Sequence, residues 1–206
     1  MSDDTVTNSG TGMDTSQLSW TLMPGVQARP FEPDDAATVY RLIQANRAHL
    51  DRWIRWSSTI QSVADAADTI AQFVTRRASG TGFHNGIWVN GQLAGGVVCR
   101  DLEPVHRHAE IGYWLGTGFT GRGLAVHAAT RAIDYLFGAR QLHRIEMQCA
   151  VDNVRSRAIP EKLGFTLEGI RRESHWIMTR FADHAVYGML AGEWARAASA
   201  LQTQPG

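Results

Sequence analysis

A glycine-rich segment in the middle of the chain has the residue types of an anion-binding loop. Residues 111–126 read Ile-Gly-Tyr-Trp-Leu-Gly-Thr-Gly-Phe-Thr-Gly-Arg-Gly-Leu-Ala-Val, an apolar run that breaks into glycines and then takes a helical pattern. Glycines let a backbone approach a ligand closely, and the first amides of a helix have no partner inside it. We therefore predict that a phosphate group binds where this segment enters the helix.

Two other nucleotide-binding motifs fit this segment less well. The P-loop needs a Gly-Lys-Ser/Thr sequence, which the chain lacks. Gly116, Gly118 and Gly121 match the dinucleotide pattern G-x-G-x-x-G, but that site needs an acidic residue about 20 positions later, at the end of the next strand. Glu146 lies inside the next expected strand instead. A nicotinamide-dependent oxidoreductase is kept as an alternative.

The elements that would position this loop alternate between strands and helices. Expected strands cover residues 26–31, 83–89, 92–100, 108–115, 143–151, 165–172 and 185–191, and expected helices begin near residues 33, 62, 125 and 152. Asn90-Gly91 predicts a type I′ hairpin turn, because both residues favour positive φ. A hairpin leading into a β-α-β unit indicates an α+β domain with a mixed, mostly antiparallel sheet of about six to seven strands and about four helices.

Composition excludes several classes of protein. Twenty basic and twenty acidic residues give a formal net charge of zero, so nucleic acid is not an expected partner. Cys99 and Cys149 lie in apolar runs and form no disulfide framework or Cys-x-x-Cys motif. No apolar stretch reaches the roughly 18 residues of a membrane span, and the N-terminus has no signal-peptide pattern. We therefore expect a cytoplasmic protein without a membrane partner.

The length of 206 residues predicts one domain with a tail at each end. Residues 1–20 are rich in Ser, Thr, Asp and Gly and have no periodicity, so we expect a mobile tail there. The domain is expected over residues 26–194, followed by a second tail over residues 195–206. His106 and His108 have no evident third ligand, so no metal site is expected.

The glycine loop and its neighbours together resemble the GNAT family of N-acetyltransferases. The coenzyme A loop of that family has the pattern Gln/Arg-x-x-Gly-x-Gly/Ala, which residues 120–125 match except for Thr120. Residues 49–56, 110–115, 153–156 and 161–165 are also similar to family motifs and occur in the family's order. The resemblance covers residues 26–194, and within the family the chain is similar to the RimJ/RimL-like branch of ribosomal-protein N-terminal acetyltransferases.

The resemblance implies transfer of an acetyl group from acetyl-CoA to a primary amine, by direct attack in a ternary complex. The acceptor would be a protein N-terminus, such as that of a ribosomal protein, or a small amine such as an antibiotic, a polyamine or an amino acid. It also implies a splay between two central parallel strands for the pantetheine arm, and homodimers are frequent in the branch. A non-catalytic acyl-CoA sensor or assembly module is a second alternative, because Pro160 stands where many relatives have a thiolate-protonating tyrosine.

The same resemblance assigns the contacts with the cofactor. Backbone groups over Tyr113, Trp114 and Leu115 would bind the pantetheine and the thioester, with an amide near Leu115 stabilising the oxyanion. Asn153 and Ser156 would face the sulfur end, where Ser156 stabilises the thiolate and Asn153 also serves as a helix cap. The pyrophosphate would lie on the loop formed by Thr120, Gly121, Arg122, Gly123, Leu124 and Ala125.

The amine must lose a proton before or during attack, so the reaction needs a general base. The candidates are Glu110, Glu173 and His175, although Glu110 is equally well explained as an ion-paired strand residue and His175 as a surface histidine. Trp53 and Trp56 either line the acceptor channel or anchor the core. Residues 1–70 hold nine acidic and five basic residues, an excess that would favour a cationic amine. Cys149 lacks a partner base in the sequence, which argues against a covalent relay.

Overall fold

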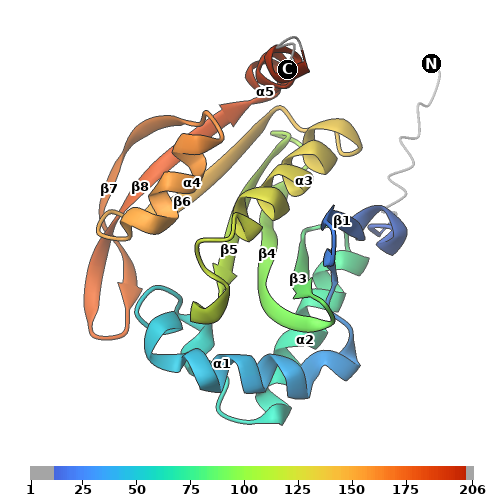
Figure 1. The fold of residues 1–206 in the computed structure, drawn as a ribbon. Coiled ribbons are helices and arrows are strands. Elements are labelled where there is room, and N and C mark those ends of the chain that lie inside the picture. The colour runs from blue at the N-terminus through green and yellow to red at the C-terminus, as the bar shows by residue number, and fades with distance from the viewer. Residues whose placement is uncertain (1–11, 203–206) are drawn as a thin grey trace, which may run out of the picture.

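The computed structural model describes residues 12–202, which form one eight-stranded sheet with helices on both faces (Figure 1). The sheet order is β1-β2-β3-β4-β5-β6-β8-β7, and every neighbouring pair is antiparallel except β5 and β6. This confirms the predicted α+β class and its parallel central pair. The strands are β1 (Trp20–Met23), β2 (Val26–Pro30), β3 (Phe83–Val89), β4 (Gln92–Glu103), β5 (His108–Leu115), β6 (Arg144–Ala150), β7 (Thr166–Ile177) and β8 (Arg180–Leu190).

Helices pack against both faces of the sheet. On one face α1 packs against β4 and α2 against β3, while on the other face α3 packs against β4 and β5, and α4 packs beside it against β6 and β7. None of the helices of residues 12–202 is long and apolar enough to cross a membrane. The helices are α1 (Ala36–Leu50), α2 (Val63–Ala78), α3 (Leu124–Gly138), α4 (Val154–Lys162) and α5 (Ala191–Gln202).

Local chemistry explains several of these boundaries. Ser62 caps α2 by accepting a hydrogen bond from the Asp65 amide at 3.1 Å. Asn90 and Gly91 have φ angles of 48° and 80°, as the predicted turn between β3 and β4 requires. Gly123, with a φ of 74°, precedes α3 in a left-handed conformation that suits glycine.

The domain extends further at both ends than the sequence predicts. Residues 1–11 of the expected tail lie outside the described residues, but Thr15–Leu18 forms a 3-10 turn and β1 begins at Trp20. Leu18 is fully buried, and its carbonyl accepts a hydrogen bond from Asn85 Nδ2 at 2.6 Å. The expected C-terminal boundary at residue 194 falls inside α5, which continues to Gln202. Both differences arise because composition alone does not reveal contacts with distant residues.

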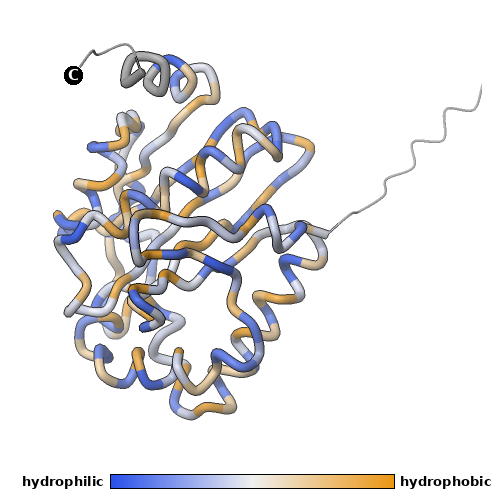
Figure 2. Tube along the Cα trace, turned by 45° about the vertical axis from the view of Figure 1, so that its right-hand side comes forward, coloured by the Kyte–Doolittle hydropathy of each residue, from blue (hydrophilic) through white to orange (hydrophobic). Residues whose placement is uncertain are grey.

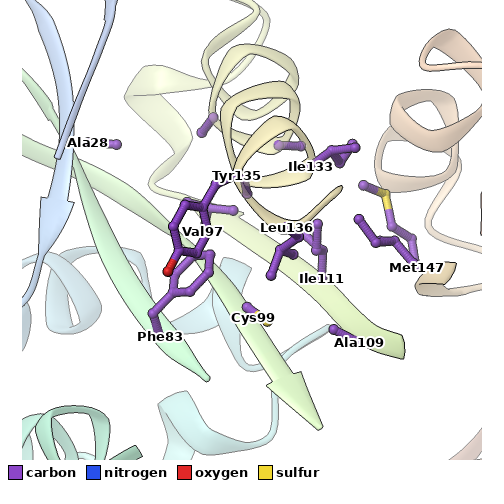
Figure 3. Packing of buried hydrophobic residues seen from close by; sticks show 14 of the residues in the cluster. Ala28, Phe83, Val97, Cys99, Ala109, Ile111, Ile133, Tyr135, Leu136 and Met147 are labelled. Atoms are coloured by element: carbon purple, nitrogen blue, oxygen red, sulfur yellow. The ribbon is translucent and has the colours of Figure 1, made fainter. Parts of the chain in front are cut away.

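Two hydrophobic cores lie on opposite faces of the sheet. The first core lies beneath α3, where Ile133 and Leu136 face Val97 and Ile111 of the strands (Figure 3). The second core joins α1 and α2 to the other face through a cluster of aromatic rings that includes Trp114. Hydrophobic and hydrophilic residues alternate along the chain, as amphipathic elements around two cores require (Figure 2).

His84 is a buried polar residue of the second core, and it predicts a pH-dependent stability. Its Nε2 accepts a hydrogen bond from Trp114 Nε1 at 2.9 Å, and burial lowers its pKa to about 3. An unfolded histidine titrates near 6.5, so below that pH the unfolded chain binds a proton that the folded chain does not. The contribution of neutral His84 to the free energy of unfolding is therefore complete above pH 6.5. It is lost as the pH falls, and at pH 5 the free energy of unfolding is lower by about 2 kcal/mol.

Urea unfolding at pH 7 and pH 5 measures this effect. The matched variant His84→Gln keeps an acceptor for Trp114 but does not titrate. We expect the wild-type protein to lose about 2 kcal/mol more unfolding free energy than the variant between the two pH values. Equal losses in both proteins would contradict the assignment.

Candidate active site

The sheet opens between its two parallel strands. β5 and β6 pair only at their first residues, with Glu110 opposite Glu146 as the last pair, yet β5 continues to Leu115 and β6 to Ala150. The Gly116 amide donates to the Ala94 carbonyl of β4 at 2.8 Å. Because backbone groups alternate in direction along a strand, those of Ile111, Tyr113 and Leu115 point away from β4 into the gap. The predicted splay is confirmed.

The glycine loop lies at the N-terminus of α3, as predicted. Gly121 and Gly123 have φ angles of 77° and 74°, and the amides of residues 121–125 have no hydrogen-bond partner among the described residues. Thr120 differs, because its amide donates to Thr117. The free amides and the positive end of the α3 dipole fit a pyrophosphate. Arg122 adds a cation whose guanidinium lies 5.5 Å from the Phe119 ring.

Side chains alternate between the two faces of the sheet along β5 and β6, so different side chains border the gap on each face. We call these two borders its walls. On the α3 face, the Tyr113 hydroxyl donates to the Ser156 carbonyl at 2.7 Å, and Ser156 Oγ donates to Cys149 Sγ at 3.3 Å. Burial raises the pKa values of the Tyr113 phenol and the Cys149 thiol. Both groups therefore stay protonated near neutral pH, which disfavours Cys149 as a nucleophile.

The start of α4 brings Ser156 to this wall. Asn153 is the N-cap of α4, and its Oδ1 accepts a hydrogen bond from the Ser156 amide at 3.2 Å. The helix-cap interpretation of Asn153 is confirmed, whereas its contact with a cofactor stays a prediction. Pro160 lies buried inside α4 and has no hydroxyl to offer.

Six polar side chains form a row across the opposite face, which we call the polar row. Cross-strand partners share a face, and the register pairs Arg100 with Glu110 and Arg171 with His184. Glu110 Oε1 binds Arg100 in an ion pair, and Glu110 Oε2 accepts from Gln148 Nε2 at 3.3 Å. The polar row comprises Arg100 of β4, Glu110 of β5, Gln148 of β6, Arg171 and His175 of β7, and His184 of β8.

His175 is the member of the polar row best suited to accept a proton. Its ring is stacked on the buried ring of His184, with centroids 3.8 Å apart, and its Nδ1 lies 3.0 Å from Ser174 Oγ. Burial lowers the pKa of His175, while the charge of Glu110 opposes this shift. Burial and the His175 ring lower the pKa of His184 to about 4. Both imidazoles are therefore neutral at pH 7.

The remaining predicted residues lie apart from the polar row. Glu173 is exposed at a bulge in β7, where its amide donates to Asp183 Oδ1 at 2.7 Å on the opposite face from His184. Trp56 packs edge-on against Trp114, with ring centroids 5.3 Å apart, so it anchors the second core. Trp53 is half-buried after α1. A role for either tryptophan in binding an acceptor stays a prediction.

Sequence reasoning did not single out Arg100, Gln148, Arg171 or His184. Alternation along each strand could have placed them on one face, but only the register brings the strands together. Among residues 12–202, no group of three or more His, Cys, Asp or Glu side chains is arranged to hold a metal ion.

Comparison with known proteins gives consistent matches over this region. Residues 26–166 match the acetyltransferase (GNAT) domain family. The chain is 33% identical over 170 residues to YdaF of Bacillus subtilis (strain 168), named as a ribosomal N-acetyltransferase, covering 82% of this chain and 93% of that protein. It is 28% identical over 152 residues to the ribosomal-protein-serine acetyltransferase of Escherichia coli (strain K12), covering 74% and 85%. A crystal structure described as an acetyltransferase superposes with a TM-score of 0.80 at 31% identity, covering 85% of this chain and 98% of that one.

Proposed function

The chain belongs to the acetyltransferase (GNAT) family, and from this premise we propose that its acceptor is the α-amino group of a protein N-terminus, ribosomal proteins foremost. The chain is an acetyl-CoA-dependent N-acetyltransferase with an amine acceptor. The names of this chain's relatives, which include a ribosomal-protein-serine acetyltransferase, support a ribosomal acceptor.

The gap between β5 and β6 is the observation that supports a direct transfer. One wall of the gap continues into the free amides at the start of α3, and the other wall carries the polar row. An acyl donor held on the first wall would present its thioester in the gap, where an amine from the second wall can reach it. Such positioning replaces an encounter in solution by a reaction within one complex.

We assign the general base to His175, because it is neutral at pH 7 and belongs to the polar row. Glu110 is assigned a positioning role, since Arg100 and Gln148 already engage both of its oxygens. Glu173 is the weaker candidate for the base because it lies towards the opposite face.

On the donor wall, the Leu115 amide is assigned to the oxyanion, in agreement with its direction into the gap. Ser156 is assigned to the departing sulfur as a hydrogen-bond donor, held in place by Asn153 and Tyr113. We assign the pyrophosphate to the amides of residues 121–125, and Asn153 and Tyr113 to the pantetheine end. Trp114 receives no such role, because its backbone groups face β4 and its side chain is buried in the second core.

An acceptor panel tests the proposed substrate. The full chain is incubated with acetyl-CoA and Ser- or Ala-initiated peptides, the same peptides with a blocked N-terminus and an internal lysine, and spermidine. We expect release of free thiol and a gain of one acetyl group only with the free N-terminus, which intact mass measures. Acetylation of spermidine or lysine alone would contradict the N-terminal acceptor.

The same panel, together with thermal melts, discriminates the two alternative functions that the sequence left open. Tight CoA binding without turnover on any amine would favour an acyl-CoA sensor or assembly module, whereas thermal protection by NAD(P) but not by CoA would favour an oxidoreductase. We further propose a cytoplasmic location, where ribosomal proteins are made. A homodimer is a proposal as well, and it is supported by the outer edge of β7, where Leu167 and Ile170 are exposed.

A further inference from the structure

Arg171 is the cation of the polar row that has no carboxylate partner among residues 12–202. It is exposed, and its Nη1 donates to the neutral side chain of Gln148 at 3.4 Å. Gln148 lies on β6 beyond the last residue that pairs with β5, so this contact holds Arg171 beside the gap. A guanidinium has five N–H donors, and most of those on Arg171 are therefore available for a ligand.

Three carboxylates of the same face are already engaged in ion pairs. Glu110 binds Arg100, and both Glu146 and Glu168 bind Arg144. A cationic acceptor such as a polyamine would have to break one of these ion pairs to use its carboxylate as a counter-charge, which costs free energy. An anionic group meets an unengaged guanidinium at no such cost.

Arginines neutralise part of the acidic excess of residues 1–70. Three of its nine carboxylates belong to ion pairs within the second core and its surroundings, so these three offer no free counter-charge to a cationic amine. These pairs are Glu32 with Arg77, Asp35 with Arg29, and Asp51 with Arg47.

Two more arginines add positive charge near the end of α1. Burial lowers the pKa of His49, and the charges of Arg155 and Arg52 lower it further, which places both guanidiniums near the same imidazole. Neither arginine has a carboxylate partner among the described residues. The end of α1 and the start of α4 thus each carry an arginine without an ion pair among the described residues.

We propose that Arg171 binds a carboxylate of the acceptor, so that the preferred acceptors are protein N-termini with Asp or Glu at the second or third residue. Arg171 is then a specificity-determining residue, and polyamines are poor acceptors. The inference rests on the proposed N-terminal acceptor and names the class of N-terminus within it. Bidentate pairing between a guanidinium and a carboxylate would supply the discrimination.

Three peptides that differ only at the second residue test this inference: Ser-Asp, Ser-Asn and Ser-Lys, each followed by the same uncharged sequence. Steady-state kcat/KM is measured for the wild-type protein and for Arg171→Gln. The matched control is Arg172→Gln, because Arg172 lies one residue along β7 and lines a hollow with Glu173 and Asp183 on the opposite face. Thermal melts verify that the variants fold.

We expect the wild-type protein to favour Ser-Asp over Ser-Asn by roughly tenfold and to disfavour Ser-Lys. Arg171→Gln should bring the Asp-to-Asn ratio close to one, while Arg172→Gln should keep it. Turnover of all three peptides at similar rates by the wild-type protein would overturn the inference and leave the proposed function standing, as would an unchanged ratio in Arg171→Gln. No turnover of any peptide, with spermidine acetylated instead, would overturn both.

Discussion

Replacing His175 by glutamine is expected to lower kcat by about two to four orders of magnitude, the usual contribution of a general base. Glutamine keeps a polar side chain of similar reach but cannot accept a proton at neutral pH. His175 belongs to the polar row and is stacked on the buried His184, so its ring has a defined position on the face that we assign to the acceptor. The dissociation constant for CoA should stay unchanged, because the glycine loop lies on the other face.

The pH profile separates a catalytic from a structural effect of this substitution. A general base must be unprotonated, so kcat should fall as the pH drops through the pKa of His175, which burial places below the usual 6.5. This acidic limb should disappear in His175→Gln. The matched variant Glu173→Gln should keep both the rate and the limb. If Glu173→Gln lost the activity and His175→Gln kept it, the base would be wrongly assigned.

A second large effect is expected in the glycine loop. Gly121→Val should weaken CoA binding by about ten- to a hundredfold, because it would disturb several amide contacts with phosphate, each comparable to a charge-assisted hydrogen bond. Gly121 has a φ of 77°, which a β-branched residue adopts only under strain. A Cβ there would meet no heavy atom within 4 Å, so the fold has room for the side chain. The loop backbone would move instead, and the amides of residues 122 and 123 with it.

Gly118→Val is the matched control for this prediction. Gly118 lies in the same loop and its Cβ would also have open space, but its φ is outside the left-handed region. Isothermal titration with CoA should therefore give a near-normal dissociation constant for this variant. Equal losses in both variants, or normal binding by Gly121→Val, would show that the left-handed backbone at Gly121 does not shape the site.

The elements nearest the donor wall could be predicted from local sequence. The strand over residues 108–115 coincides with β5, and the glycines that follow it mark the start of α3. Both are local signals: alternation fixes the strand, and glycine marks where the backbone turns left-handed. The turn at Asn90 and Gly91 was predictable for the same reason.

Features that depend on distant contacts were missed. Leu18, just before β1, and Trp20 of β1 are buried, and Leu18 is held by a contact with a distant residue, Asn85 of β3. β7 is exposed along most of its length, so its charged residues carry no strand pattern, and it was predicted to end at residue 172 instead of Ile177. The polar row draws on five strands, and no single segment contains enough of it to be recognised.

The alternation of side chains along β5 bears on how substrates enter the protein and products leave it. Tyr113 and Glu110 project from opposite faces of one strand, so the sheet separates the two faces and the gap beside β5 is a window that connects them. A donor and an acceptor that meet at the window can withdraw in opposite directions. With the donor and the acceptor bound as we propose, neither product blocks the exit of the other, and a large folded acceptor needs access to only one side of the domain.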